Sequence, residues 1–310
     1  MKKINFKFVA LGVTLVVGLL LTYSCSKDRI AQPTLNAYNS PNSYLDSKQQ
    51  AEQEFTIDSA GTGPIVGNQG TKIWTGKQCL MMPNGDTVIY PFKVKLVELY
   101  TAKDIIYYRM PTVAGGNILE TDGEIRLRAF KGATELLLKP GGCYAQIEMP
   151  NAAPKNYMRV FYGYNPSASF VDFSDNPTTV GAATTSLNPL FTATSYGYLG
   201  QIGKLGWINC GVNAANTSSS ILTFTSTVDD LTNVAIFAYI PATKTVIQAY
   251  NLSTCQIPNG AAVKIIAIAV DASNQLFYFN QNLTISSSQQ ISVTMNSTTD
   301  ASLTALLNGL

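Results

Sequence analysis

Beyond residue 70, most of the chain consists of runs rich in apolar residues and separated by turn-forming residues, and in two of these runs apolar and polar positions alternate. In the run 92–100, Phe92, Val94 and Leu96 alternate with Lys93 and Lys95, and the run 124–130 has the same pattern. This period predicts strands with one apolar and one polar face. Further strand candidates, separated by turn-forming residues, occur at 88–90, 104–108, 135–139, 143–149, 158–164, 169–173, 205–210, 221–228, 234–240, 245–250, 263–270, 275–279 and 291–295.

These runs predict an all-β fold, with two β-sandwich domains at residues 55–151 and 152–310. The boundary is placed at a proline-bounded break, after which the chain has no glutamate and few lysines or arginines. The segment Pro83-Asn84-Gly85-Asp86 predicts a hairpin turn. Residues 301–307 are expected to form a short closing helix, capped by Thr299 or Asp300.

The first residues have the pattern of an export signal, which we assign to 1–24. A basic start (Lys2, Lys3) precedes the uncharged apolar run 8–21, which is shorter than the ~20 residues of a membrane-spanning helix. Ser24-Cys25 then resembles the lipobox of bacterial lipoproteins, in which the cysteine is acylated and becomes the new N-terminus. The alternative is an ordinary cleaved signal with an unrelated cysteine nearby. Residues 25–54 are polar and without an apolar period, so we expect a flexible tether.

The residues directly after Cys25 give an indication of where in the cell envelope the protein lies. Ser26-Lys27-Asp28-Arg29 is a charged segment that resembles the surface-export signals of Bacteroidetes lipoproteins. The resemblance implies a Gram-negative outer membrane, with the protein anchored by its lipid and facing the cell surface. The periplasmic face of that membrane is the alternative.

The first predicted sandwich also resembles a known family. Residues 70–151 are similar to the ZU-five domain, a β-sandwich that serves as an interaction and scaffold module. The resemblance rests on Gly70-Thr71-Lys72-Ile73, Val94-Lys95-Leu96-Val97-Glu98, Asp104-Ile105-Ile106, the run 119–129 with Gly123, and Leu136-Leu137-Leu138-Lys139-Pro140-Gly141-Gly142. Some members cleave themselves at a His-Phe-Ser site, an activity that a chain without histidine does not inherit. Residues 152–310 look like the uncharacterised C-terminal half found behind such domains in other Bacteroidetes lipoproteins.

The composition limits the reactions that the chain can catalyse and the partners that it can bind. The chain has no histidine, which excludes serine triads and cysteine–histidine dyads. A net charge of +2 gives no electrostatic reason to expect nucleic acid as a partner. No cofactor, metal or catalytic residue is expected. A pair of carboxylates suited to glycoside hydrolysis is the alternative, drawn from Glu98, Asp104, Glu120, Asp122 and Glu124.

Four cysteines remain in addition to Cys25: Cys79, Cys143, Cys210 and Cys255. An oxidising compartment favours disulfides, and the domain boundary favours the pairs Cys79–Cys143 and Cys210–Cys255. The alternative is four reduced, buried thiols. Asp229-Asp230 predicts a turn between strands, with a calcium contact as the alternative.

Aromatic residues give the one ligand-binding hypothesis. An exposed row of such side chains would stack on sugar rings, but aromatics also fill sandwich cores, as we expect for Phe161 and Trp207. The candidates for the row are Tyr162, Tyr164, Tyr196, Tyr198 and Trp207. Asp58-Ser59-Ala60 and Asp86-Thr87-Val88 also resemble short O-glycosylation sequences.

Two functions follow from these patterns. The first is a non-enzymatic surface lipoprotein whose sandwiches contact a protein or matrix partner. The alternative is a glycan-binding lipoprotein accessory to an outer-membrane uptake system. An exposed row of tyrosine and tryptophan favours the second, and their burial favours the first.

Overall fold

The computed structural model describes residues 34–59, 63–167, 170–214 and 218–310. It confirms the all-β fold. The chain divides into the units Met1–Asn36 and Ala37–Leu310, and every helix and strand named below lies in the second. The expected export signal (1–24) and Cys25 lie outside the described residues. Of the helices within the described ranges, none has the length and apolarity needed to cross a bilayer.

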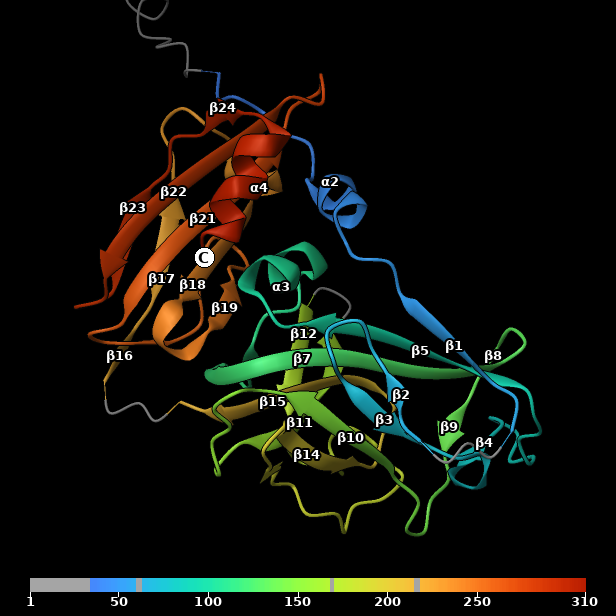
Figure 1. The fold of residues 1–310 in the computed structure, drawn as a ribbon. Coiled ribbons are helices and arrows are strands. Elements are labelled where there is room, and N and C mark those ends of the chain that lie inside the picture. Colours follow the sequence, from blue (N-terminus) through green and yellow to red (C-terminus); the bar gives the residue numbers. More distant parts are fainter. Residues whose placement is uncertain (1–33, 60–62, 168–169, 215–217) are drawn as a thin grey trace, which may run out of the picture. The chain divides into compact units, whose positions relative to one another are not determined.

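Three sheets form the body (Figure 1). The first has the order β1 (Gln53–Ile57), β5 (Phe92–Leu99), β7 (Asn117–Lys131), β15 (Gly206–Asn213), β11 (Arg159–Ser167), β12 (Phe170–Ser174), with β6 (Val113–Ala114) and β8 (Thr134–Glu135) also paired to β7. The second has the order β13 (Thr192–Ala193), β14 (Gly197–Ile202), β10 (Ala145–Pro150), β3 (Lys72–Trp74), β2 (Ile65–Val66). The third has the order β19 (Thr245–Gln248), β18 (Ala235–Ile240), β21 (Ala262–Val270), β22 (Leu276–Thr284), β24 (Asn296–Thr298).

Shorter elements complete the body. The remaining strand pairs are β4 (Leu80–Met81) with β9 (Leu137–Leu138), β16 (Ser219–Ser220) with β20 (Ile257–Pro258), and the parallel pair β17 (Leu222–Thr225) with β23 (Gln289–Ser292). The helices are α2 (Asn42–Ser47), α3 (Ala102–Tyr108), α4 (Asp300–Asn308) and the 3₁₀ turns η1 (Lys77–Cys79), η2 (Leu231–Asn233) and η3 (Pro241–Thr243).

Alternating side chains build three cores. The first and second sheets face each other across a first core, to which Leu96 and Ile125 contribute from one sheet and Ile73 and Ile147 from the other. This pair of sheets is a β-sandwich. The opposite face of the first sheet packs on the helices and on part of the third sheet, which forms a second core. A third core fills the other face of the third sheet.

The division expected after residue 151 does not coincide with a division between sheets. Strand β15 lies hydrogen-bonded between β7 and β11, and Ile208 pairs with Ile125. Strand β14 likewise pairs with β10 along its whole length. The first sandwich therefore takes strands from both sides of residue 151, and the third sheet begins only at Ala235.

The flexible tether expected for residues 25–54 needs correction over its second part. Tyr38 and Leu45 are buried, the first in the core of the third sheet and the second against the helices. Residues 42–47 form helix α2, and β1 begins at Gln53. The Tyr38 hydroxyl donates to Asp229 at 2.7 Å, and the Asn39 amide donates to the Val270 carbonyl. Two widely spaced side chains, Tyr38 and Leu45, thus hold this polar segment against the folded body, although the segment has no apolar period.

The strand expected at 104–108 is helix α3. The Thr101 hydroxyl accepts the Asp104 amide N–H at 3.2 Å and caps the first turn. Ile105, Ile106 and Tyr107 are buried, and the helix ends at Arg109, which has a left-handed backbone. The run 88–90 lies outside any strand. The closing helix is confirmed as α4, and Thr299 is its N-cap.

The disulfide Cys79–Cys143 is confirmed. The second pair, Cys210–Cys255, is wrong, because both of these cysteines are free. Cys210 belongs to the core between the first two sheets, whereas Cys255 packs against the core of the third sheet. Burial raises the pKa of both thiols, that of Cys255 to about 12, so both are poor nucleophiles.

We expect loss of the disulfide in a C79S/C143S variant to lower the free energy of unfolding by about 4 kcal/mol, because it closes a long loop. Urea denaturation measures this. Reductant should bring the wild-type midpoint down to that of the variant and leave the variant itself unchanged. A midpoint that responds equally to reductant in both proteins would contradict the assignment.

Candidate binding face

The acids considered as a catalytic pair have structural partners. Glu98 is fully buried in β5, where its carboxylate accepts the amide N–H groups of Gln69 and Thr71, each at 2.9 Å, and the side-chain amide of Gln53 at 2.8 Å. A side chain at Gly67 would overlap this carboxylate. Glu98 therefore fixes the turn that leads into β3.

Asp122 is also buried and is held by cations. Its Oδ1 accepts from Lys244 at 2.8 Å, and its Oδ2 lies 3.3 Å from Lys155 Nζ and 2.6 Å from the Tyr198 hydroxyl. Burial alone would raise the pKa of Asp122, but these partners outweigh it and hold the pKa below its usual value. Lys155 also pairs with Glu120 at 2.7 Å. Both acids are thus neutralised within one ionic cluster.

Glu124 has a different environment. It is fully buried, and only its Oε1 is hydrogen-bonded, to the Asn209 amide at 2.9 Å. Its Oε2 has no partner among the described residues. Burial raises the pKa of Glu124 to about 8, so the carboxyl is protonated at neutral pH. Asp104, the fifth acid, serves the cap of α3.

The aspartates at 229–230 lie at the turn into η2, as expected. Asp229 is buried and accepts from the Tyr38 hydroxyl and from the Met295 amide at 2.9 Å. Asp230 accepts the Thr232 amide and caps η2. No group of three or more metal-ligating side chains occurs within the described ranges.

The expected aromatic row is not formed on one exposed face. Tyr162 and Tyr198 are 6% and 0% exposed, and both belong to the core between the first two sheets. Tyr164 packs against the same core, but Trp207 packs on the opposite face of the first sheet, edge-on to Tyr108 at 5.8 Å. Phe161, in β11, is buried on that opposite face. Successive side chains of β11 and β15 point to opposite faces of the first sheet, so these aromatic residues cannot form one row.

Tyr196 alone among the five lies by the outer face of the second sheet. Its hydroxyl donates to the Gly70 carbonyl at 2.5 Å, and Lys72 Nζ lies 3.3 Å from the centre of its ring. Lys72 in turn pairs with Glu148 at 3.0 Å, across β3 and β10. Lys72 therefore connects the Tyr196 ring to Glu148, on the face of the second sheet that points away from the core.

The same outer face carries two aromatic residues that the sequence analysis missed. Trp74 is opposite Gln146 in the β3–β10 register, so these side chains share a face with Tyr144, two residues earlier. Ile73, Ala145 and Ile147 occupy the inner face. The period of two in the sequence could have placed both aromatic residues on the outer face, because Trp74 directly follows the inward-facing Ile73 and Tyr144 directly precedes the inward-facing Ala145.

Further residues extend this outer face. Val66 pairs with Lys72 and is 51% exposed, and Tyr144 is 38% exposed. Gln201 is opposite Gln146 on β14. We call these side chains the outer sheet face: Val66, Lys72, Trp74, Tyr144, Gln146, Glu148, Gln201 and Tyr196.

A cleft opens at the disulfide end of the outer sheet face. It encloses about 300 Å³ and is bounded by Trp74, Thr75, Gln78, Cys79 and Tyr144. The Thr75 hydroxyl is buried and has no hydrogen bond to any described residue. Two aromatic rings and several polar groups thus meet in one solvent-accessible hollow.

No family model and no curated protein matches the chain. Among solved structures, gamma-CGTase from alkalophilic Bacillus clarkii aligns with 8% sequence identity and a TM-score of 0.19. The alignment covers 72% of this chain and 41% of the enzyme's length. A similarity of this size carries no argument about fold or activity.

Glu124 makes stability depend on pH. Its pKa in the folded state is about 8, against about 4.5 for an ordinary glutamate, so its protonation favours the folded state. The contribution is complete below pH 4.5 and is lost as the pH rises through 8. We expect the free energy of unfolding to fall over this range by on the order of a few kcal/mol, and expect E124Q to lack this fall.

Denaturation at a series of pH values between about 5 and 9 measures the effect. The absence of histidine removes the side chain that ordinarily titrates there. The exposed Glu135 has a lowered pKa and remains ionised over this range, so E135Q is the control and should retain the wild-type slope. An equally steep fall in E124Q would contradict the assignment to Glu124.

Proposed function

We propose that the protein is an exported, lipid-anchored envelope protein that acts by binding a partner and has no catalytic activity. The export signal and Ser24-Cys25 support the anchor. The outer sheet face is the observation that carries the binding function. The acids considered as an alternative catalytic pair instead fix a turn, in the case of Glu98, or neutralise lysines, in the case of Asp122.

The composition of the outer sheet face suits a protein partner. Its one ion pair, Lys72–Glu148, is satisfied within the face, so the remaining surface is aromatic, aliphatic or amide in character. Protein interfaces are enriched in tyrosine and tryptophan and depleted of unpaired charge. The exposed Val66 at one edge and Tyr144 near the disulfide extend the apolar contribution.

Glycan binding is the second candidate, and the cleft between Trp74 and Tyr144 favours it. Aromatic rings offer flat apolar surfaces for sugar rings, and the amides of Gln78, Gln146 and Gln201 supply donors and acceptors for hydroxyl groups. Under this candidate the protein would be accessory to an outer-membrane uptake system.

The anchor is tested at Cys25. We expect the protein to incorporate an alkyne-labelled fatty acid and to sediment with the outer membrane, and expect C25S to lose both properties. C255S, which removes a free cysteine of the folded body, is the control and should behave as wild type. Labelling of intact cells with an impermeant amine reagent tests exposure. Equal acylation of C25S would contradict the lipoprotein assignment.

The outer sheet face is tested with a photo-crosslinking amino acid at Gln146 in living cells. We expect a protein adduct that W74A/Y144A weakens by about thirtyfold, because buried aromatic residues dominate interface energies. Tyr157→Ala is the matched control, since Tyr157 is 46% exposed and lies outside this face.

Electrophoresis through gels that contain polysaccharides tests the second candidate with the same variants. Retardation lost in W74A/Y144A and kept in Tyr157→Ala would favour a glycan. Adducts and retardation that are identical in all variants would contradict both candidates.

A further inference from the structure

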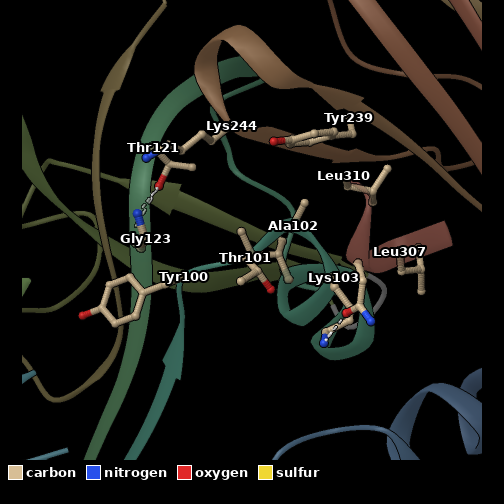
Figure 2. Close-up of a pocket in the computed structure, with 12 residues that line it drawn as sticks. Tyr100, Thr101, Ala102, Lys103, Thr121, Gly123, Tyr239, Lys244, Leu307 and Leu310 are labelled. Atoms are coloured by element: carbon tan, nitrogen blue, oxygen red, sulfur yellow. Dashed lines mark hydrogen bonds between the residues drawn. The ribbon is translucent and has the colours of Figure 1, made fainter. Parts of the chain in front are cut away.

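A cavity of about 290 Å³ lies apart from the outer sheet face, between elements that are distant in sequence (Figure 2). The start of α3, the middle of β7, the turn that contains η3, and the end of α4 each contribute to its wall. An engineered apolar cavity of about 150 Å³ accommodates benzene. The cavity is therefore large enough for a ring that carries a polar substituent.

Tyr239 supplies an unpartnered hydroxyl. The side chain is 7% exposed. Its hydroxyl forms no hydrogen bond to another described residue and is not among the buried polar atoms without a partner, so it is open to solvent in the cavity. Figure 2 shows that this hydroxyl points into the cavity, on the side of Thr121 and Lys244. Burial raises the pKa of Tyr239, so the group remains a donor at neutral pH. A ligand with an acceptor atom at this point would take the hydrogen bond that this hydroxyl otherwise gives to water.

Lys244 brings positive charge to the same wall. Its Nζ lies 2.8 Å from Asp122, and Asp122 is also 3.3 Å from Lys155, whose other partner is Glu120. Lys244 therefore shares its counter-ion with a second lysine. Lys244 has a φ of 53°, a left-handed conformation that a lysine seldom adopts and that asparagine or glycine adopts more easily.

A second lysine lies across the cavity. Lys103 Nζ donates to the Asn308 side-chain oxygen at 2.7 Å, and it makes no ion pair with any side chain in the described ranges. Ile105, Leu307 and Leu310, from α3 and the end of the chain, add apolar surface, and Thr101, Thr121 and Asn308 add further polar groups. The wall thus combines hydrogen-bond donors and two lysines with apolar surface.

We propose that this cavity binds a small organic carboxylate with an aromatic or short aliphatic body. The carboxylate accepts from the Tyr239 hydroxyl and the Lys244 ammonium group, and the body packs against Ile105, Leu307 and Leu310. The site is independent of the outer sheet face, so either proposal stands if the other fails.

The test uses isothermal titration of the purified folded body with phenylacetate, and with phenylacetamide as the uncharged isostere. We expect saturable one-to-one binding of phenylacetate and at least tenfold weaker binding of phenylacetamide. Y239F, which removes only the hydroxyl, should weaken phenylacetate binding about tenfold. K244N, which suits the left-handed backbone, should weaken it by more than tenfold.

Two controls separate binding from folding. K131M removes a lysine that bonds to Pro91, away from the cavity, and should leave the affinity unchanged. Thermal melting shows whether Y239F and K244N are folded. Absence of phenylacetate binding to the wild type at 10 mM overturns the proposal. So does equal affinity for phenylacetamide, or an affinity unaffected by both Y239F and K244N.

Discussion

Strand β7 is buried on both faces, and the rest of the body is arranged around it. It pairs with β5 on one side and β15 on the other. Ile125 and Leu127 face the core of the sandwich, whereas Ile118 and Leu119 reach the two cores nearer the third sheet. The pairing with β5 ends at Glu124, beside Gly123, where φ is 133° and any side chain would overlap the Tyr100 ring, whereas the pairing with β15 continues past it. A register shift in β15 lies opposite. The glycine and the bulge together let one strand serve three cores.

The polar groups of β7 gather at this same bend. Asp122 and Glu124 flank Gly123, and both are buried, although the first is ionised among lysines and the second is kept neutral by burial. Burying an acidic side chain lowers stability unless the side chain is paired. Acids at these positions therefore indicate that hydrogen bonds and ion pairs, rather than the burial of apolar surface, determine which residue is found there. They also explain why acids spaced closely in sequence resemble a catalytic pair and yet serve the fold.

Strands with alternating residues, such as β17 and the first half of β5, could be predicted from the sequence because burial of one face imposes the period of two. The pairing of β15 with β7 could not, since alternation identifies the face of a strand but not its neighbour. Helix α3 was missed because its short apolar run outweighed the Thr101 cap signal. Of the candidate aromatic row, Tyr162 and Tyr198 fill the core, and Trp74 and Tyr144 were overlooked although the alternation around Ile73 and Ala145 places both outside.

The docking of the N-terminal segment has a mechanical consequence. Residues that precede β1 are fastened in sequence, first to the third sheet through Asn39 and the Tyr38–Asp229 bond, then to α4 through Tyr44 and Asp300, and then to α3 through Asp46 and Arg109. A force applied to the N-terminal side of the segment would act on these attachments one after another, in the order in which they occur in the sequence. The strand pairing of β1 with β5 would bear no force until all of them had opened. Unfolding that starts from this side must therefore break the contacts of the segment before it reaches the sandwich.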